Sequence, residues 1–273
     1  GEQFKTLDTW SEIVDHLVAT HARRDSVIIA LGGGVVGDIS GFAAASYMRG
    51  IRFLQIPTTL LAQVDASVGG NTGVNHDNGK NLIGAFHQPA TVVIDTSTLD
   101  TLAPREFSAG MAEVVKYGAI NDPGFLDWLE DHAERINARD PGALNHLIER
   151  SVLNKADIVR LDEKEAGVRA LLNFGHSFGH ALEAHTAYSE FLHGEAVAIG
   201  MVTAARLSEN RGLCPPGAAR RLESLLRAFD LPVYIPQSSS TESLAEALTL
   251  DKKAVASGLR LILLKELGHA IID

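Results

Sequence analysis

Short apolar runs that end at glycine or proline alternate with helical patterns through the first hundred residues. Residues 26–31 run into three glycines and residues 51–56 run into a proline, and both runs predict strands buried in a parallel sheet. The small residues 43–45 between them predict a helix, and residues 91–95 predict a third strand. Strands that alternate with helices predict an α/β layer of the nucleotide-binding type.

From residue 104 onward the pattern becomes mainly helical. We expect helices at 106–120, 144–159, 170–187, 196–210 and 218–229, whereas 259–264 fits either a strand or the end of a helix. The change predicts an α/β domain over residues 1–102 and a mainly helical metal- and substrate-binding domain over residues 103–273. A cleft between two such halves is a common place for a ligand.

Composition narrows the class of protein. A chain that is 45% hydrophobic and 21% charged, without low-complexity tracts, is typical of a globular protein rather than a disordered one. The net charge of −10 argues against a general nucleic-acid binder, although a local basic pocket could still hold a small anion. No apolar run reaches the length of a membrane span. One cysteine, Cys214, excludes an internal disulfide and favours a reducing, cytoplasmic compartment.

A glycine-rich segment, residues 32–38, joins the first predicted strand to the helix that follows. Glycines let a backbone approach a pyrophosphate, and the helix N-terminus offers free N–H groups to its charge. The spacing departs from the full Rossmann fingerprint, so a tight turn capped by Asp38 remains an alternative. Thr58 and Thr59 follow the next strand and either add hydroxyl donors at the same sheet edge or cap a helix.

Two further polar features can be interpreted either as ordinary surface residues or as part of a functional site. Residues 71–81 are polar and rich in glycine, which predicts a loop that reaches a ligand, with Lys80 either binding it or solvated at the surface. Glu113 and Lys116 lie three residues apart on a predicted helix, where an ordinary surface ion pair is the simplest interpretation. Their small, apolar neighbours favour a buried pair instead, and a buried pair needs a functional reason.

The segment around residue 176 predicts a binding site. On a continuous helix, Arg169, Asn173, His176 and His180 fall at offsets 0, 4, 7 and 11 and form one polar stripe, while the other faces are apolar. A polar stripe on a buried helix must face solvent or a site, and we interpret this one as a site.

Histidine and glutamate supply the donors of a candidate metal site. Two or three imidazoles from His176, His180 and His193, together with the carboxylate of Glu113, can hold a catalytic divalent cation with one position left open. The spacing alone does not decide whether His180 or His193 completes the ligand set.

Six segments, in order along the chain, resemble the 3-dehydroquinate synthase family: residues 33–38, 56–65, 79–86, 109–118, 172–180 and 193–197. The resemblance extends through nearly the whole chain and implies a Rossmann-like NAD-binding domain followed by an α-helical metal-binding domain. By the same resemblance, an N-terminal segment with the first strands of the nucleotide sheet and a short C-terminal tail are absent. We therefore expect uncovered apolar surface, a tendency to aggregate and no activity from these residues alone.

The resemblance implies an NAD- and metal-dependent lyase of the shikimate pathway. Such an enzyme converts 3-deoxy-D-arabino-heptulosonate 7-phosphate to 3-dehydroquinate and phosphate. Hydride passes to NAD, phosphate is eliminated, hydride returns, and ring opening with an aldol closure follows, so NAD is not consumed. The metal, expected to be zinc with cobalt as an alternative, acts as a Lewis acid on the substrate hydroxyls.

The family's site residues carry over by position. The metal ligands become Glu113, His176 and His193, which makes His180 a substrate-site histidine and a candidate proton relay. The other implied catalytic residues are Asp65, Asn81, Lys116, Lys155, Arg169, Asn173 and Lys252, with Arg49 reaching the neighbouring subunit's site in a homodimer. The implied cofactor-binding residues are Glu2, Gln3, Phe4, Lys5, Gly34, Val35, Val36, Gly37, Asp38, Thr58, Thr59, Asn71, Lys80, Thr98, Leu99, Asp100 and Thr101.

One position departs from the family, and other functions remain open. Asn71 stands where the family usually has a lysine that touches cofactor and substrate phosphate, so we expect weaker substrate binding rather than a new reaction. The alternatives are a related sugar phosphate cyclase of secondary metabolism, a metal-dependent alcohol dehydrogenase of the same broad fold, and a non-catalytic domain or remnant.

Overall fold

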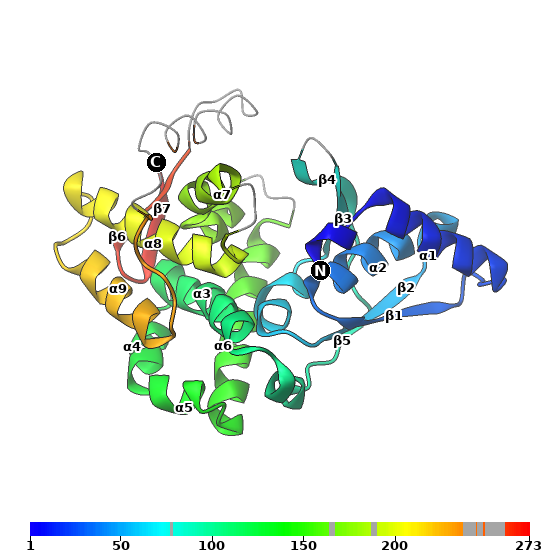
Figure 1. Ribbon diagram of the computed structural model, residues 1–273, viewed down its shortest axis with the longest axis horizontal. Coiled ribbons are helices and arrows are strands. Elements are labelled where there is room, and N and C mark those ends of the chain that lie inside the picture. The colour runs from blue at the N-terminus through cyan, green and yellow to red at the C-terminus, as the bar shows by residue number, and fades with distance from the viewer. Residues whose placement is uncertain (77–78, 164–166, 187–189, 237–243, 245–247, 249–259) are drawn as a thin grey trace. The chain divides into compact units, whose positions relative to one another are not determined.

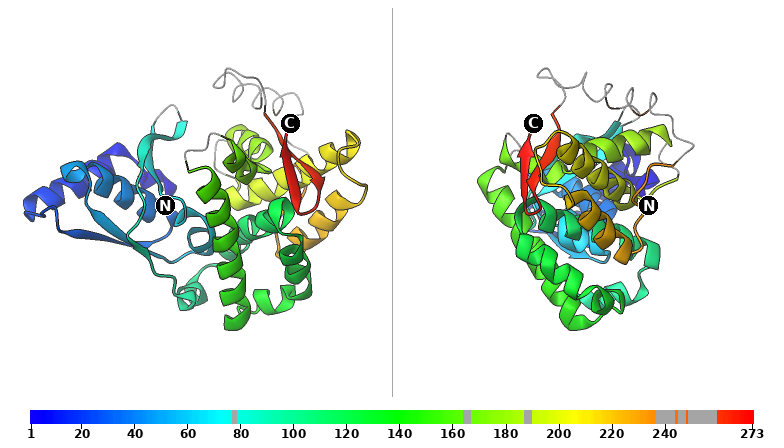
Figure 2. Two further views of the ribbon diagram at one scale, coloured as in Figure 1. Left: turned by 180° about the vertical axis from the view of Figure 1, so that it is seen from behind. Right: turned by 90° about the vertical axis from the view of Figure 1, so that its left-hand side faces the viewer.

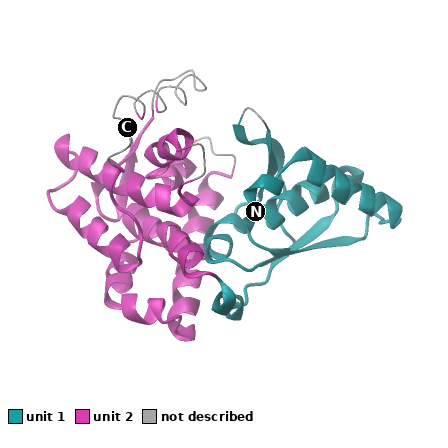
Figure 3. Cartoon of the chain, in the orientation of Figure 1, with its two compact units in different colours: residues 1–102 teal, residues 103–273 magenta. Residues whose placement is uncertain are grey.

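The structure is a computed structural model that describes residues 1–76, 79–163, 167–186, 190–236, 244, 248 and 260–273. The chain divides into two compact units, Gly1–Leu102 and Ala103–Asp273 (Figure 3). Lys252, an expected substrate contact, lies outside the described residues, as does residue 187 at the end of a predicted helix. Within the described ranges, no helix combines the length and the apolar character that crossing a membrane requires.

The first unit is built on a parallel sheet, as predicted. Strands β1 (Val27–Gly32), β2 (Arg52–Pro57) and β5 (Thr91–Val92) pair in the order β1-β2-β5. Gly32 pairs with Pro57, so the carboxyl ends of β1 and β2 meet at one edge of the sheet. That edge carries the glycine-rich segment and the threonine pair.

Two helices cover one face of this sheet (Figure 1). Helix α2 (Gly34–Ser46) packs on β1 and β2, and α1 (Leu7–Ala19) packs on α2. Phe53 of β2 anchors the buried cluster between them. The prediction that β1 is a buried strand is wrong for part of it, because Ile29 and Leu31 are 63% and 61% exposed whereas Ala30 between them is 3% exposed.

The predicted loop at residues 71–81 is wrong, because the segment forms most of a β-hairpin. Strand β3 (Asn71–His76) pairs antiparallel with β4 (Gly79–Phe86), and Gly73 lies opposite Gly84. A Cβ atom at Gly84 would lie 2.1 Å from the carbonyl oxygen of Thr72. The glycines that suggested a loop therefore let two strands approach closely.

Shorter helical turns complete the first unit. They are the 3₁₀ turns η1 (Glu2–Phe4), η2 (Tyr47–Arg49) and η4 (Thr96–Thr101) and the π-helical turn η3 (Ala62–Ala66). Met48 and Arg49 in η2 both have positive φ, at 49° and 66°, a conformation that costs energy for residues other than glycine.

The second unit is mainly helical, as predicted. Its helices are α3 (Pro104–Asn121), α4 (Pro123–Asp131), α5 (Ala133–Asn137), α6 (Pro141–Leu161), α7 (His176–His185), α8 (His193–Asn210) and α9 (Ala218–Ala228). Most of α3 and α8 is buried, so these two helices form the centre of the unit. A hairpin of β6 (Ile262–Glu266) and β7 (His269–Ile272) lies beside α8, which settles the ambiguous segment near 260 as a strand (Figure 2).

The predicted helix at 170–187 is interrupted, and its polar stripe is not continuous. A 3₁₀ turn, η5 (Val168–Asn173), ends before Gly175, which has φ of +82°, and α7 begins at His176. A Cβ atom at Gly175 would lie 2.6 Å from Cγ of Met201 in α8. The close approach of α8 therefore requires glycine and a turn here, and periodicity alone could not reveal that contact.

Candidate active site

Glycines bring together the three helices that carry the predicted metal ligands. A Cβ atom at Gly194 would lie 1.9 Å from the carbonyl oxygen of Ala109 in α3, and one at Gly200 would lie 2.0 Å from that of Gly175. The start of α8 therefore rests directly on α3, and its middle rests on the turn before α7. This packing places His193, His176 and Glu113 near one point.

An ion pair fixes the same junction. The Arg105 guanidinium donates two hydrogen bonds to the Glu195 carboxylate, at 2.6 and 2.7 Å. Glu195 also accepts the backbone N–H of Leu192 at 2.8 Å, which satisfies a donor at the start of α8. The first turns of α3 and α8 are thus tied together next to His193. Neither Arg105 nor Glu195 was among the predicted site residues.

The triad of Glu113, His176 and His193 has the geometry of a metal site. One ligand atom from each residue lies within 4.8 Å of the others. Nε2 of His176 is 3.6 Å from Oε1 of Glu113, and the ring centroids of the two histidines are 5.2 Å apart. The structure therefore brings together the three residues that the family resemblance implied.

The surroundings of Glu113 fit a bound cation. Its side chain is 1% exposed, and its Oε1 accepts no hydrogen bond from the described residues. Lys116, 2% exposed, forms an ion pair with it, so the pair is buried rather than on the surface. Buried carboxylate oxygens without hydrogen-bond donors are costly, and a divalent cation would satisfy them.

The two imidazoles of the triad have opposite pKa shifts. Burial, aided by the charge of Lys116 and by the neighbouring histidines, holds the pKa of His176 well below its ordinary value, which keeps a lone pair available for a cation. Burial also works to lower the pKa of His193. The hydrogen bond and charge of Glu183 outweigh that effect and raise the pKa of His193.

His180 is exposed and lies beside the triad rather than within it. Its ring centroid is 5.5 Å from that of His176 and 5.9 Å from that of His193. It belongs to a second group of possible ligands with Glu183 and His193. Glu183 was not predicted, yet it lies seven residues after His176 and three after His180, on the same face of α7. That spacing was the signal for it.

Three other predicted residues of the second unit lie on or after α6. Lys155 and Arg169 are buried, at 7% and 2% exposed, and Asn173 is half-buried at the end of η5. The Arg169 guanidinium donates to the carbonyl oxygen of Glu163 at 2.5 Å. Buried cations of this kind are suited to hold a carboxylate or phosphate.

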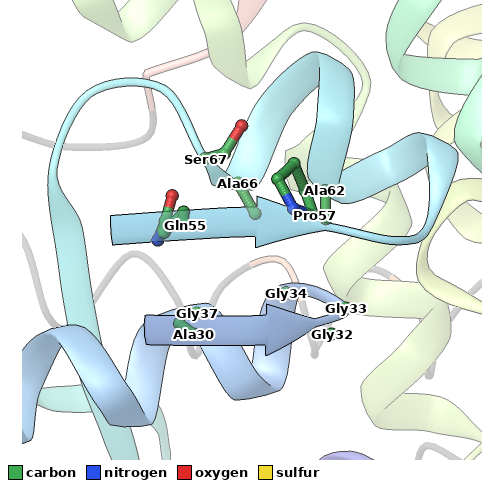
Figure 4. Close-up of a pocket in the computed structure, with 10 residues that line it drawn as sticks. All are labelled: Ala30, Gly32, Gly33, Gly34, Gly37, Gln55, Pro57, Ala62, Ala66 and Ser67. Carbon is green, nitrogen blue, oxygen red and sulfur yellow. The ribbon is translucent and has the colours of Figure 1, made fainter. Parts of the chain in front are cut away.

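The glycine-rich segment lines a pocket in the first unit (Figure 4). Helix α2 starts after Gly33 without a side-chain cap and without an acidic residue in its first turn, so its N-terminal N–H groups suit an anion. Asp38 is not an N-cap, contrary to that alternative, whereas Thr59 Oγ1 does accept the N–H of Ala62. The residues that line the pocket are Ala30, Gly32, Gly33, Gly34, Gly37, Gln55, Pro57, Ala62, Ala66 and Ser67.

A buried lysine joins predicted cofactor and substrate residues within this unit. Lys5 Nζ donates to Asp38 Oδ2 and to Asn81 Oδ1, both at 2.6 Å. Asn75 accepts the N–H of Asn81 and donates to Glu2 at 2.7 Å. The N-terminal residues are therefore attached to α2 and to the hairpin, although residues 2–5 showed no pattern of their own.

The remaining predicted residues of the first unit occupy varied settings. Thr98 accepts a hydrogen bond from the buried Gln63 at 3.0 Å, which ties η4 to η3. Asp65 is half-buried in η3, whereas Arg49 is exposed. Gln3, Phe4, Asn71, Lys80, Asp100 and Thr101 are exposed, Thr58 is half-buried, and Leu99 is buried.

Comparison with known proteins identifies the family. The model of the 3-dehydroquinate synthase N-terminal region matches residues 1–109, and that of the C-terminal region matches residues 110–254. The chain belongs to the 3-dehydroquinate synthase family. It is 54% identical to the 3-dehydroquinate synthase of Halorhodospira halophila and 56% identical to that of Methylococcus capsulatus, each over 272 residues. The matches cover 100% of this chain and 77% and 76% of those relatives.

Solved structures related to the 3-dehydroquinate synthase family share the fold. A 2-epi-5-epi-valiolone synthase from Streptomyces hygroscopicus, with NAD⁺ and Zn²⁺ bound, is 33% identical with a TM-score of 0.92. A 2-deoxy-scyllo-inosose synthase, complexed with carbaglucose-6-phosphate, NAD⁺ and Co²⁺, is 32% identical with a TM-score of 0.91. Each match covers 100% of this chain and 76% of the other.

Proposed function

We propose that the intact protein catalyses the 3-dehydroquinate synthase reaction, which forms 3-dehydroquinate and phosphate from 3-deoxy-D-arabino-heptulosonate 7-phosphate. The observation that carries the proposal is the buried triad of Glu113, His176 and His193 in a chain more than half identical to 3-dehydroquinate synthases along its whole length. This function belongs to the shikimate pathway of aromatic biosynthesis.

Each member of the triad has a defined role in the proposal. Glu113, His176 and His193 hold the divalent cation, zinc or cobalt, since a mixed nitrogen and oxygen donor set suits both. A bound cation and a bound NAD together supply polarised substrate hydroxyls and reversible hydride transfer. Lys116 compensates the Glu113 charge, and its charge also helps to keep His176 neutral.

The residues around the triad bind the substrate and move protons. His180 is exposed beside the two histidine ligands, a position from which an imidazole can relay a proton to or from a substrate hydroxyl. Lys155, Arg169 and Asn173 supply the positive charges and hydrogen bonds that a carboxylate and a departing phosphate require.

The first unit supplies the NAD site in the proposal. The pocket of Gly32, Gly33 and Gly34 and the uncapped start of α2 receive the pyrophosphate. Lys5 fixes the carboxylate of Asp38 through an ion pair in which the lysine side chain is 6% exposed. The same lysine holds Asn81, so the cofactor and substrate residues of this unit are positioned together.

Assembly and location form a second part of the proposal. We infer a homodimer in which Arg49 enters the neighbouring subunit's site, because the family resemblance implies it and Arg49 is exposed. A cytoplasmic location suits a chain whose single thiol, Cys214, is buried and unpaired.

Phosphate release by the intact protein tests the reaction. With heptulosonate phosphate as substrate, we expect release that requires NAD and stops when a chelator removes the cation, with no net NADH. Phosphate release only from sedoheptulose 7-phosphate would indicate a sister cyclase, and accumulating NADH would indicate an alcohol dehydrogenase. Either result would overturn the proposal.

A further inference from the structure

The two histidines of the triad are oriented in the same way by different acceptors. His176 places Nδ1 3.3 Å from the carbonyl oxygen of Phe174, and its Nε2 faces Glu113. His193 places Nδ1 3.4 Å from Oε2 of Glu183. A carboxylate only accepts hydrogen bonds, so the His193 Nδ1 must carry the proton, and the lone pair lies on Nε2.

We propose that Glu183 is a positioning residue that fixes the tautomer and ring orientation of His193 for divalent-cation binding. The inference rests on the proposed function, because it assumes that the triad holds the cation. Nothing in the sequence pattern or the family resemblance assigned a role to Glu183. A hydrogen-bonded acceptor on the distal nitrogen of a metal-binding histidine fixes its ring and makes it a stronger ligand.

The packing explains why His193 needs such an acceptor. It is the first residue of α8, and its side chain is 35% exposed, so packing alone confines the ring less than it would a buried side chain. The side chain of Glu183, in contrast, is only 4% exposed, so it is well confined by its surroundings. Its neighbour Leu182 packs against Ala196 and Ile199 of α8, which holds α7 and its carboxylate in place.

Glu183 is better placed to orient a ligand than to be one. His180, Glu183 and His193 also lie within ligand distance of one another, so a second cation bound there is the competing interpretation. A second cation bound through Nδ1 of His193 would displace this nitrogen's hydrogen bond to Glu183. Glu113, in contrast, has a buried Oε1 that accepts no hydrogen bond from the described residues and lies 3.6 Å from Nε2 of His176.

Metal affinity of the intact protein tests the inference without relying on turnover. The variants are Glu183→Ala, which removes the acceptor, and Glu183→Gln, which keeps an oxygen acceptor without charge. We expect Glu183→Ala to weaken Zn²⁺ affinity by about 10- to 100-fold in competition with a chromogenic chelator. Glu183→Gln should retain more affinity than Glu183→Ala. His185→Ala, at the exposed end of α7, is the matched control and should bind Zn²⁺ like the unmodified protein.

The visible spectrum of bound Co²⁺ separates orientation from general destabilisation. Glu183→Ala should shift the absorption bands, since His193 would no longer hold one orientation, whereas His185→Ala should not. Unchanged affinity in Glu183→Ala, or equal losses in both Glu183 variants, would overturn the inference. So would two Zn²⁺ ions bound by the unmodified protein and one by the variants. Failure of the unmodified protein to bind any Zn²⁺ would instead refute the proposed function.

Discussion

Lys116 and Glu113 form an ion pair within α3 in which the two side chains are only 2% and 1% exposed. A pair so deeply buried is weak evidence for stability, because desolvation offsets its attraction. Its significance is that it places a carboxylate and an ammonium group in the interior, beside two imidazoles. Lys116 thus balances the charge of Glu113 before a cation arrives.

Replacing Lys116 with methionine should therefore destabilise the metal-free protein. Lys116→Met leaves the Glu113 charge buried and uncompensated, and breaking one side of such a pair costs about 3–5 kcal/mol of unfolding free energy. Saturating zinc should reduce this loss, because the cation supplies the missing positive charge. Urea unfolding with chelator and with zinc measures both values.

The control for this variant is an exposed lysine. Lys80→Met on β4 should change the unfolding free energy by no more than about 0.5 kcal/mol in either condition. An equal loss for Lys116→Met with and without zinc would contradict the charge-balancing role.

His176 should make the metal-free protein sensitive to acid. Its folded pKa lies below the ordinary 6.5, so below pH 6.5 the unfolded chain binds a proton that the folded site does not. The stability that His176 contributes is therefore present above pH 6.5 and lost as pH falls toward the lowered pKa. His193 has a raised pKa, so its contribution is present below 6.5 and lost as pH rises through its folded pKa.

The variant His176→Gln isolates the first effect. In chelator, its unfolding free energy should fall less than that of the unmodified protein between about pH 6.5 and pH 5. His185→Gln, which changes an exposed histidine of the same helix, should keep the unmodified slope. If the unfolding free energy of His176→Gln changed with pH as steeply as that of the unmodified protein, this explanation would be wrong.

The sequence could predict the elements but not the contacts that glycine permits between them. The strands β1 and β2 and the helices α3 and α8 follow from periodicity and from glycine and proline boundaries. In the sequence, Gly175, Gly73 and Gly84 are recognisable only as small residues. Their role is to let a neighbouring segment of the chain approach closely, which only the structure shows. The predictions of a continuous helix at 170–187 and of a loop at 71–81 were therefore wrong.

For a similar reason, the sequence predicted only some residues of the candidate site. Glu113, His176 and His180 stood out because polar groups in apolar helices are unusual, and the resemblance selected His193 as a ligand. Glu183 and Glu195 have the same chemistry as many surface carboxylates. The spacing of Glu183 from His176 and His180 is only a weak signal. The burial of Glu183 and Glu195, at 3% and 9% exposed, distinguishes them from surface carboxylates, and burial depends on tertiary packing.

Gly194→Ala should disrupt the metal centre by separating two helices. The added methyl group would lie 1.9 Å from the carbonyl oxygen of Ala109, so α8 must move away from α3 and take His193 with it. We expect weaker Zn²⁺ binding and a lower melting temperature. Gly124→Ala in α4 is the matched control, since its nearest contact would be an ordinary 3.9 Å. That variant should be neutral or slightly more stable, and similar behaviour of the two would argue against the packing role.

Asn71→Lys should strengthen substrate binding in the intact enzyme. Asn71 is exposed at the start of β3, where the resemblance places a lysine that contacts phosphate. A restored charge-assisted contact is worth about 1.5–3 kcal/mol, which corresponds to roughly tenfold or more in KM or kcat. Steady-state phosphate release measures both constants. Asn145→Lys adds the same charge on the exposed side of α6 and should change neither. If Asn71→Lys leaves both constants unchanged, or if Asn145→Lys has the same effect, the missing lysine does not limit this enzyme.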